Sequence, residues 1–216
     1  AFSQLLHIFY LLYSLCLIVL FSFLWQELIC FRLINASHEG VYMPMIDQPA
    51  PQFTTDSLVD GGEFKKIALS DYKGKWVVLF FYPLDFTFIC PTELTQFRDR
   101  LKDFSGANAI VLGCSVDSVH SHKRWQKDDL GNLGYPLLSD LTKRISRDYG
   151  VLLEEKGLAT RGTFIVDPDQ KIQYMGIHNT GVGRDANEIL RVLQALQSGE
   201  LCGAGWKKGD NFVKAK

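Results

Sequence analysis

The stretch KWVVLFFYPLDFTFICPTELTQFRDRLKDF, residues 75–104, joins two different patterns through a short loop. Residues 75–83 are a continuous apolar run rich in β-branched and aromatic side chains, which is typical of a strand buried on both faces. Residues 91–104 begin with a proline, which suits the first helical turn, and carry apolar residues at helical spacing: Leu94, Phe97, Leu101 and Phe104. The stretch therefore predicts a strand that leads through a loop into a helix whose N-terminus is at Cys90.

The same alternation of patterns continues toward the C-terminus. We expect further strands at residues 109–116, 135–140, 161–167 and 171–178. We expect further helices at residues 118–128, 143–150 and 185–197. Asp185 and Glu188 have the spacing of a capping box at the start of the last helix. Alternating β and α units predict a three-layer α/β domain with a central sheet flanked by helices.

Composition limits the function classes. A chain of 216 residues with 47% hydrophobic and 22% charged residues can close one sizeable core, so we expect one folded domain. The formal net charge is only −1, so the protein has no field that would draw nucleic acid or anionic lipid. Nucleic acid is therefore not an expected partner.

The N-terminal region has a different character. Residues 1–26 contain no Asp, Glu, Lys or Arg, and residues 8–25 are long enough to cross a bilayer as a helix. The segment is either a membrane anchor or uncleaved signal, or upstream sequence outside the working protein. We expect a hydrophobic extension at residues 1–35, a folded domain at residues 40–210 and a short tail at residues 211–216. The membrane is a partner only if the extension is genuine.

The five cysteines are odd in number and widely spread: Cys16, Cys30, Cys90, Cys114 and Cys202. None belongs to a C-x-x-C pair or to a Cys/His zinc pattern. This usage argues against a structural disulfide framework and suits a reducing compartment with a reactive thiol. We therefore expect a cytoplasmic protein, with a membrane-anchored or exported protein as the alternative.

Cys90 is the candidate nucleophile. Unpaired backbone N–H groups and the positive end of the macrodipole at a helix N-terminus favour a thiolate. The alternative is a buried structural cysteine, a common fate of a lone cysteine among apolar residues. Thr87 offers a hydroxyl, Glu93 a carboxylate in the same helical turn, and Pro83 restricts the loop.

Other chemistries have little local support. The sequence has no Gly-rich phosphate loop and no Ser-His-Asp pattern, which argues against phosphoryl or acyl transfer. His120 and His122 are two residues apart on an expected helix and do not share a face well, so we do not expect a metal site. Cys114 lies inside an expected buried strand and is a core candidate. No cofactor is expected.

Pro83, Thr87 and Cys90 fit the P-x-x-x-T-x-x-C motif of the peroxiredoxins, and FYPLDFTFICPTEL (residues 81–94) resembles that motif in their typical two-cysteine members. The resemblance continues in order through SVDSVHSHKRW, PLLSDL, RGTFIVD, VGRDANEILR and GELCGAGWKKGD. It covers nearly all of residues 40–210. The hydrophobic N-terminus has no place in it.

This resemblance implies a thioredoxin-like three-layer fold with a central mixed β-sheet. It also implies an antioxidant thiol peroxidase that reduces hydrogen peroxide and alkyl hydroperoxides without a metal or cofactor. Cys90 matches the peroxidatic cysteine, and Thr87 and Arg161 match the active-site threonine and arginine. The remaining matches support the site: Pro83 shields it, Glu93 orients the arginines, and Arg184 is a secondary member of the network.

The resemblance further implies that Cys202 is the resolving cysteine, which forms a disulfide with Cys90 of the other subunit of a homodimer. Gly203 replaces the proline that usually follows this cysteine. A thioredoxin-type or flavoprotein reductase would reopen the disulfide. The dimer would join edge to edge through residues 171–178, and a ring of dimers such as a decamer could follow. The alternatives are a thiol-disulfide oxidoreductase, which the lack of C-x-x-C disfavours, and a holdase chaperone of the same fold.

Overall fold

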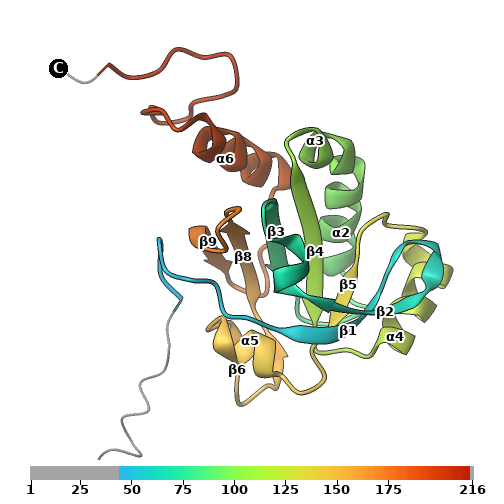
Figure 1. Ribbon diagram of the computed structural model, residues 1–216. Coiled ribbons are helices and arrows are strands. Elements are labelled where there is room, and N and C mark those ends of the chain that lie inside the picture. Colours follow the sequence, from blue (N-terminus) through green and yellow to red (C-terminus); the bar gives the residue numbers. More distant parts are fainter. Residues whose placement is uncertain (1–43, 215–216) are drawn as a thin grey trace, which may run out of the picture. The chain divides into compact units, whose positions relative to one another are not determined.

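The computed structural model describes residues 44–214 of the 216-residue chain (Figure 1). The hydrophobic extension expected at residues 1–35, with Cys16 and Cys30, lies outside the described residues. Between residues 44 and 214, no helix is long and apolar enough to cross a membrane. The expected domain boundaries and the cytoplasmic location therefore stay predictions.

A seven-stranded mixed sheet forms the centre of the domain, with the strand order β2-β1-β5-β4-β3-β8-β9. Its strands are β1 (Thr54–Leu58), β2 (Phe64–Ala68), β3 (Trp76–Phe81), β4 (Ala109–Ser115), β5 (Leu137–Ser139), β8 (Arg161–Val166) and β9 (Ile172–His178). The β3–β4 and β4–β5 pairs are parallel, and the other pairs are antiparallel. This arrangement confirms the expected α/β fold of the thioredoxin-like class with a mixed sheet.

Strand β3 lies near the middle of this sheet, between β4 and β8. Successive side chains of a strand point to opposite faces. The β3 run accordingly serves two cores: Val78, Phe80 and Tyr82 pack on one face, and Val77, Leu79 and Phe81 on the other. An alternating polar strand could not satisfy both faces, which is why the continuous apolar pattern predicted this strand correctly.

The helices surround the sheet (Figure 1). They are α2 (Cys90–Asp99), α3 (Leu101–Gly106), α4 (Val119–Trp125), α5 (Arg144–Asp148) and α6 (Ala186–Ser198). Side chains from α2, α3, α4 and α6 share one core with β3, whereas Ile145 of α5 belongs to the core on the other face. Helices thus flank both faces, as three layers require.

Two expected helices are divided in the structure. The helix expected at residues 91–104 is interrupted at Arg100, which has φ −101° and ψ 3° and separates α2 from α3. The helix expected at residues 118–128 continues from α4 into a π-helical turn, Gln126–Leu130. In α6, Asp185 caps the N-terminus by accepting from the Asn187 N–H, but Glu188 pairs with Arg191 instead of completing a capping box.

The sequence reading missed two hairpins. Strands β1 and β2 pair in antiparallel register, and β6 (Leu152–Leu153) pairs with β7 (Leu158–Ala159). Both β6 and β7 are two residues long, too short for a periodic pattern. The β2 sequence FKKIA has no alternation of apolar and polar residues, and only Ile67 of it is buried, so no strand pattern was visible there.

The segment after α6 extends away from the end of that helix in Figure 1. It is attached through Trp206, whose ring stacks on Phe212 with 5.5 Å between centroids and whose carbonyl accepts from Arg191 at 2.8 Å. Trp206 is buried, whereas Leu201 and Val213 are exposed. Cys202 lies in this segment, near the C-terminal end of α6.

Replacement of Gly113 by alanine should destabilise the fold. A Cβ at this β4 position would lie 2.8 Å from Cδ2 of Leu137, closer than real contacts allow, and 3.0 Å from Cζ of Phe80, tighter than most. Overpacking of this kind costs about 1–3 kcal/mol. Urea unfolding should show this loss for Gly113→Ala and a near-wild-type midpoint for Gly106→Ala, where a Cβ would meet nothing within 4 Å. Equal stability of the two variants would contradict this description of the sheet.

Candidate active site

Cys90 is the first residue of α2, at the end of the loop that follows β3. Pro91 occupies the first turn, as expected, and no side chain caps this end of the helix. The Cys90 side chain is fully buried in the core shared with Leu94 and Phe97. The local sequence therefore places a thiol at a helix N-terminus, inside the protein.

A buried network, which the sequence reading did not find, fixes the loop before Cys90. The Tyr82 hydroxyl donates to one oxygen of Asp85 at 2.9 Å, and His122 Nδ1 lies 2.8 Å from the other. The Asp85 backbone N–H donates to Asp117 at 2.9 Å. Burial and the nearby Asp85 raise the pKa of Asp117. Because Asp85 and His122 are 37 residues apart, no local pattern indicates that they meet.

Thr87 and Pro83 lie where the motif predicted, at the same pocket as Cys90. The Thr87 hydroxyl donates to the Leu84 carbonyl at 3.0 Å, which orients its oxygen within the loop. Pro83 is buried. Because the single hydroxyl proton is donated to Leu84, this hydroxyl can act toward a ligand only as an acceptor, through the lone pairs of its oxygen.

Arg161 is the first residue of β8, and its side chain contacts Cys90. Its Nη1 donates to Cys90 Sγ at 3.4 Å and also to a carboxylate oxygen of Glu93. Its Nε donates to the carbonyl of Thr180 at 3.0 Å, so the guanidinium is held from two sides. The Arg161 side chain is only 3% exposed. A buried cation thus lies directly beside the thiol.

Arg184 binds the other oxygen of Glu93. Its Nε and its backbone N–H donate to Oε1 at 2.8 and 2.9 Å. The guanidinium also donates to the carbonyls of Phe81 and Gly162 and to the hydroxyl of Thr163. Burial lowers the pKa of Arg184, and the Glu93 charge opposes this effect. The two arginines and Glu93 therefore form one buried network.

This network leaves excess positive charge beside the sulfur. Two guanidinium groups share one carboxylate, and all three side chains are at most 3% exposed. Electrostatic interactions in such a poorly hydrated region are stronger than in water. The arrangement therefore stabilises negative charge on the Cys90 sulfur or on an atom bound next to it.

The pocket at Cys90 has a volume of about 310 Å³ and is hereafter called the Cys90 pocket. Its lining residues are Pro83, Leu84, Thr87, Phe88, Ile89, Cys90, Lys156, Leu158, Arg161 and Thr180. Its wall is mainly apolar, and its polar groups include a thiol, a hydroxyl and a guanidinium. Such a pocket can bind a small polar group at the thiol and apolar groups along its wall.

Cys202 does not line the Cys90 pocket. Its Sγ lies 3.4 Å from the Ser198 hydroxyl and 3.8 Å from the Ala195 carbonyl, at the end of α6. Within residues 44–214, Cys90, Cys114 and Cys202 are all free thiols. The structure of one chain therefore does not bring the two expected redox partners together.

Cys114 is a core residue, as the sequence indicated. It is fully buried in β4, and burial raises the pKa of its thiol well above the usual value. The thiolate is the reactive form of cysteine. Cys114 is therefore poorly suited to attack a substrate.

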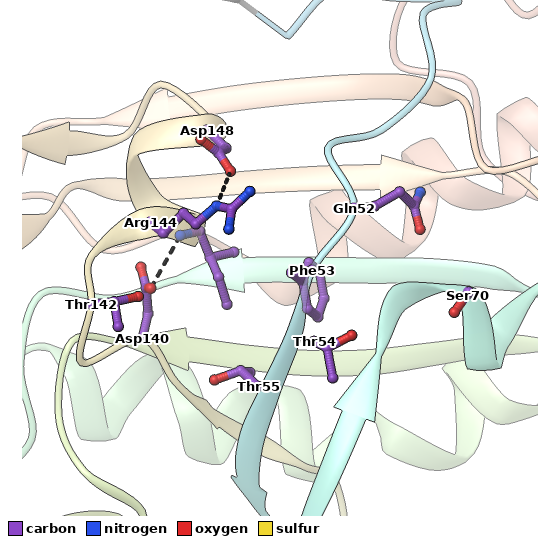
Figure 2. Close-up of a pocket in the computed structure, with 10 residues that line it drawn as sticks. Gln52, Phe53, Thr54, Thr55, Ser70, Asp140, Thr142, Arg144 and Asp148 are labelled. Carbon is purple, nitrogen blue, oxygen red and sulfur yellow. Dashed lines mark hydrogen bonds and ion pairs between the residues drawn. The ribbon is translucent and has the colours of Figure 1, made fainter.

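Figure 2 shows a second pocket, of about 370 Å³, where residues around β1 face those of α5. Its charged groups are engaged locally: Arg144 pairs with Asp148 at 3.6 Å, and Asp140 accepts from the Ile145 N–H at 3.1 Å. No cysteine lines it. This pocket offers no thiol chemistry.

Comparisons with known proteins agree with this geometry. Residues 46–175 match the AhpC/TSA family. Peroxiredoxin prdx-2 of Caenorhabditis elegans is 51% identical over 178 residues, 78% of this chain and 88% of that protein. Thioredoxin peroxidase of Trypanosoma brucei rhodesiense is 48% identical over 179 residues, 79% of this chain and 90% of that protein.

A solved structure shows the same fold. Reduced 2-Cys peroxiredoxin of Plasmodium vivax superposes with a TM-score of 0.75 at 37% sequence identity, covering 77% of this chain and 91% of that one. The chain therefore belongs to the AhpC/TSA family, and it is an antioxidant peroxidase of the peroxiredoxin type.

Proposed function

We propose that the chain reduces hydrogen peroxide and alkyl hydroperoxides at Cys90, and that Cys202 of a second copy resolves the oxidised thiol. The observation that carries the proposal is the Arg161 guanidinium, which lies 3.4 Å from the Cys90 sulfur and is fixed by Glu93. A positioned cation of this kind stabilises both the thiolate and the charge that develops on a departing oxygen.

The first step is a two-electron oxidation of sulfur. The Cys90 thiolate attacks one oxygen of the peroxide, an S–O bond forms, and the O–O bond breaks. Arg161 and Thr87 line the pocket in which the peroxide would bind. The remaining oxygen leaves as water or alcohol after taking a proton, and Cys90 becomes a sulfenic acid.

The second step needs movement, because Cys90 is fully buried and Cys202 lies outside its pocket. The first turn of α2 must open to expose the sulfenic acid. Cys202 is partly exposed, on a segment that follows α6. Attack by this thiol then releases water and forms the disulfide.

The edge strand β9 supports the proposed homodimer, and the separation of Cys202 from the Cys90 pocket supports its assignment to the partner subunit. Strand β9 is the last strand of the sheet, and Ile177 on it is 45% exposed. An edge strand readily pairs with the same strand of another copy. The name of the trypanosome relative supports a thioredoxin-type reductant for this chain, with a flavoprotein reductase as the alternative.

Replacement of Cys90 by serine should abolish peroxide consumption, because the hydroxyl is a far weaker nucleophile than the thiolate. Residual hydrogen peroxide after mixing with reduced protein is the measurement. Cys114→Ala is the matched control and should keep activity, since Cys114 is buried away from the pocket. The proposal would be overturned if folded Cys90→Ser consumed peroxide at the wild-type rate. It would also be overturned if folded Cys114→Ala lost activity while Cys90→Ser kept it.

Replacement of Cys202 by serine should leave the first step intact and stop the second. After one equivalent of peroxide, non-reducing electrophoresis should show a disulfide-linked dimer for the wild type and monomer for Cys202→Ser. Dimedone should then label Cys90 in the variant, because its sulfenic acid persists. A covalent dimer in Cys202→Ser, or a disulfide within one wild-type chain, would contradict the proposed resolving step.

A further inference from the structure

The Cys90 pocket is larger than hydrogen peroxide requires. Its volume is about 310 Å³. A cavity that holds a single water needs only about 10–15 Å³ on the same measure, so the pocket is much larger than a molecule of the size of hydrogen peroxide needs. The reacting group needs only the end formed by Cys90, Thr87 and Arg161. Most of the pocket is therefore open to the organic part of a larger hydroperoxide.

The rest of the wall suits hydrocarbon. Leu84, Phe88, Ile89 and Leu158 contribute apolar surface to the pocket. The Phe88 side chain is 94% exposed, so its ring presents apolar surface to solvent. A bound hydrocarbon would remove this surface from water, which favours binding.

Lys156 introduces charge into this apolar wall. Among the described residues that line the Cys90 pocket, Lys156 and Arg161 are the cations, and none is a carboxylate. Arg161 is committed to Glu93 and to the thiol. Lys156 is solvent-exposed, so its ammonium can meet an anionic group of a ligand.

The position of Lys156 is fixed by the β6–β7 hairpin. Its backbone N–H donates to the Leu153 carbonyl at 3.0 Å, and the next residue, Gly157, donates to the same carbonyl at 2.8 Å. Gly157 has φ +64°, a conformation that glycine adopts without strain. The hairpin thus holds one lysine backbone at the pocket while leaving its long side chain able to adjust.

Neighbouring carboxylates do not cancel this charge. Glu154 receives two hydrogen bonds from Arg147, at 2.6 and 2.9 Å, and these bonds lower the pKa of its carboxyl. Its negative charge is therefore matched by Arg147. Glu155 is exposed and does not line the Cys90 pocket.

We propose that Lys156 gives the Cys90 pocket a preference for amphipathic hydroperoxides that carry a carboxylate, such as fatty-acid hydroperoxides, over neutral ones of equal size. The inference rests on the peroxidase function proposed above. The hydroperoxide lies at Cys90, the hydrocarbon contacts the apolar wall, and the carboxylate meets Lys156. Lys156 acts as a specificity-determining residue, because it binds the substrate away from the reacting atoms.

The chemistry at sulfur is the same for every substrate. The thiolate takes the terminal OH of R–O–OH, so the S–O bond forms as the O–O bond breaks. Sulfur loses two electrons, and the peroxide is reduced to an alkoxide. The alkoxide takes up the proton that the thiol released and leaves as the alcohol. Lys156 therefore affects how well the substrate binds, and the bonds formed and broken at sulfur are the same with or without it.

The test compares a linoleic acid hydroperoxide with its methyl ester, both below their micellar concentrations. Reduced protein in excess is mixed with each hydroperoxide, and the second-order rate constant of peroxide loss is measured in a single turnover. For Lys156→Gln, we expect the rate for the acid to fall about two- to fivefold, as for an exposed ion pair. The readout is the ratio of the acid rate to the ester rate, and the rates for the ester and for hydrogen peroxide should fall less than the rate for the acid. Lys156→Glu should slow the acid further, and added salt should reduce these differences.

Lys102→Gln is the matched control, because it removes an equal charge from an exposed site outside the pocket. The inference is overturned if the acid and the ester respond equally to Lys156→Gln, or if Lys102→Gln slows the acid as much. Hydrogen peroxide separates this failure from that of the proposed function. If the wild type does not reduce hydrogen peroxide, the proposed function itself is wrong.

Discussion

The structure around Cys90 depends on one buried carboxylate that is shared by two arginines. Glu93 lies in the first turn of α2, Arg161 begins β8, and Arg184 lies just before α6. Removal of one member of such a buried network leaves unpaired charge inside the protein, which typically costs about 3–5 kcal/mol. The same bonds that join these three elements therefore also position a cation at the sulfur.

This arrangement explains how stability and reactivity share a site. Burial of these charges costs free energy, but both oxygens of the Glu93 carboxylate accept hydrogen bonds, and both guanidinium groups donate to it. Arg184 donates to backbone carbonyls of β3 and β8, so it fixes the C-terminal end of β3, where the loop to Cys90 begins. In the proposed cycle, Cys90 must nevertheless leave its buried position. Glu93 lies in the same first turn of α2, so opening of this turn also disturbs its pairs with the arginines, and re-formation of these pairs favours the return of α2 to the closed position.

The sequence predicted the parts of the fold that have strong local patterns. The apolar run of β3 and the spaced apolar residues of α2 needed no knowledge of distant contacts. The break at Arg100 and the β6–β7 hairpin were missed, because a helix kink and two-residue strands leave little periodic signal. Strand β2 is stabilised by pairing with β1, and its sequence FKKIA has no apolar alternation from which this pairing could be predicted.

The site was predictable to different depths. Pro83, Thr87 and Cys90 are local, and the place of Cys90 at a helix N-terminus suggested a reactive thiol, with a buried structural cysteine as the alternative. Arg161 and Arg184 are 68 and 91 residues from Glu93, so only the family resemblance connected them, and the geometry now shows the contacts. Lys156 was not identified from sequence, because a single lysine in a turn has no distinctive pattern. The resolving role of Cys202 remains a proposal, because the structure describes one chain and the proposed partner cysteine belongs to a second copy.

The most direct measurement of the central claim is the second-order rate constant for reaction of folded Glu93→Gln with hydrogen peroxide, with far-UV circular dichroism to confirm the fold. Glu188→Gln is the matched control, because Glu188 also binds an arginine through two bonds, at 2.6 and 2.7 Å, but on the exposed surface. We expect at least about a tenfold loss for Glu93→Gln, since a charge-assisted hydrogen bond that positions Arg161 is weakened, and less than about a twofold change for Glu188→Gln. If the Gln variant does not fold, Arg161→Met tests the same contact from the other side and should show a comparable loss. A folded Glu93→Gln or Arg161→Met protein that reacts at the wild-type rate would contradict the account.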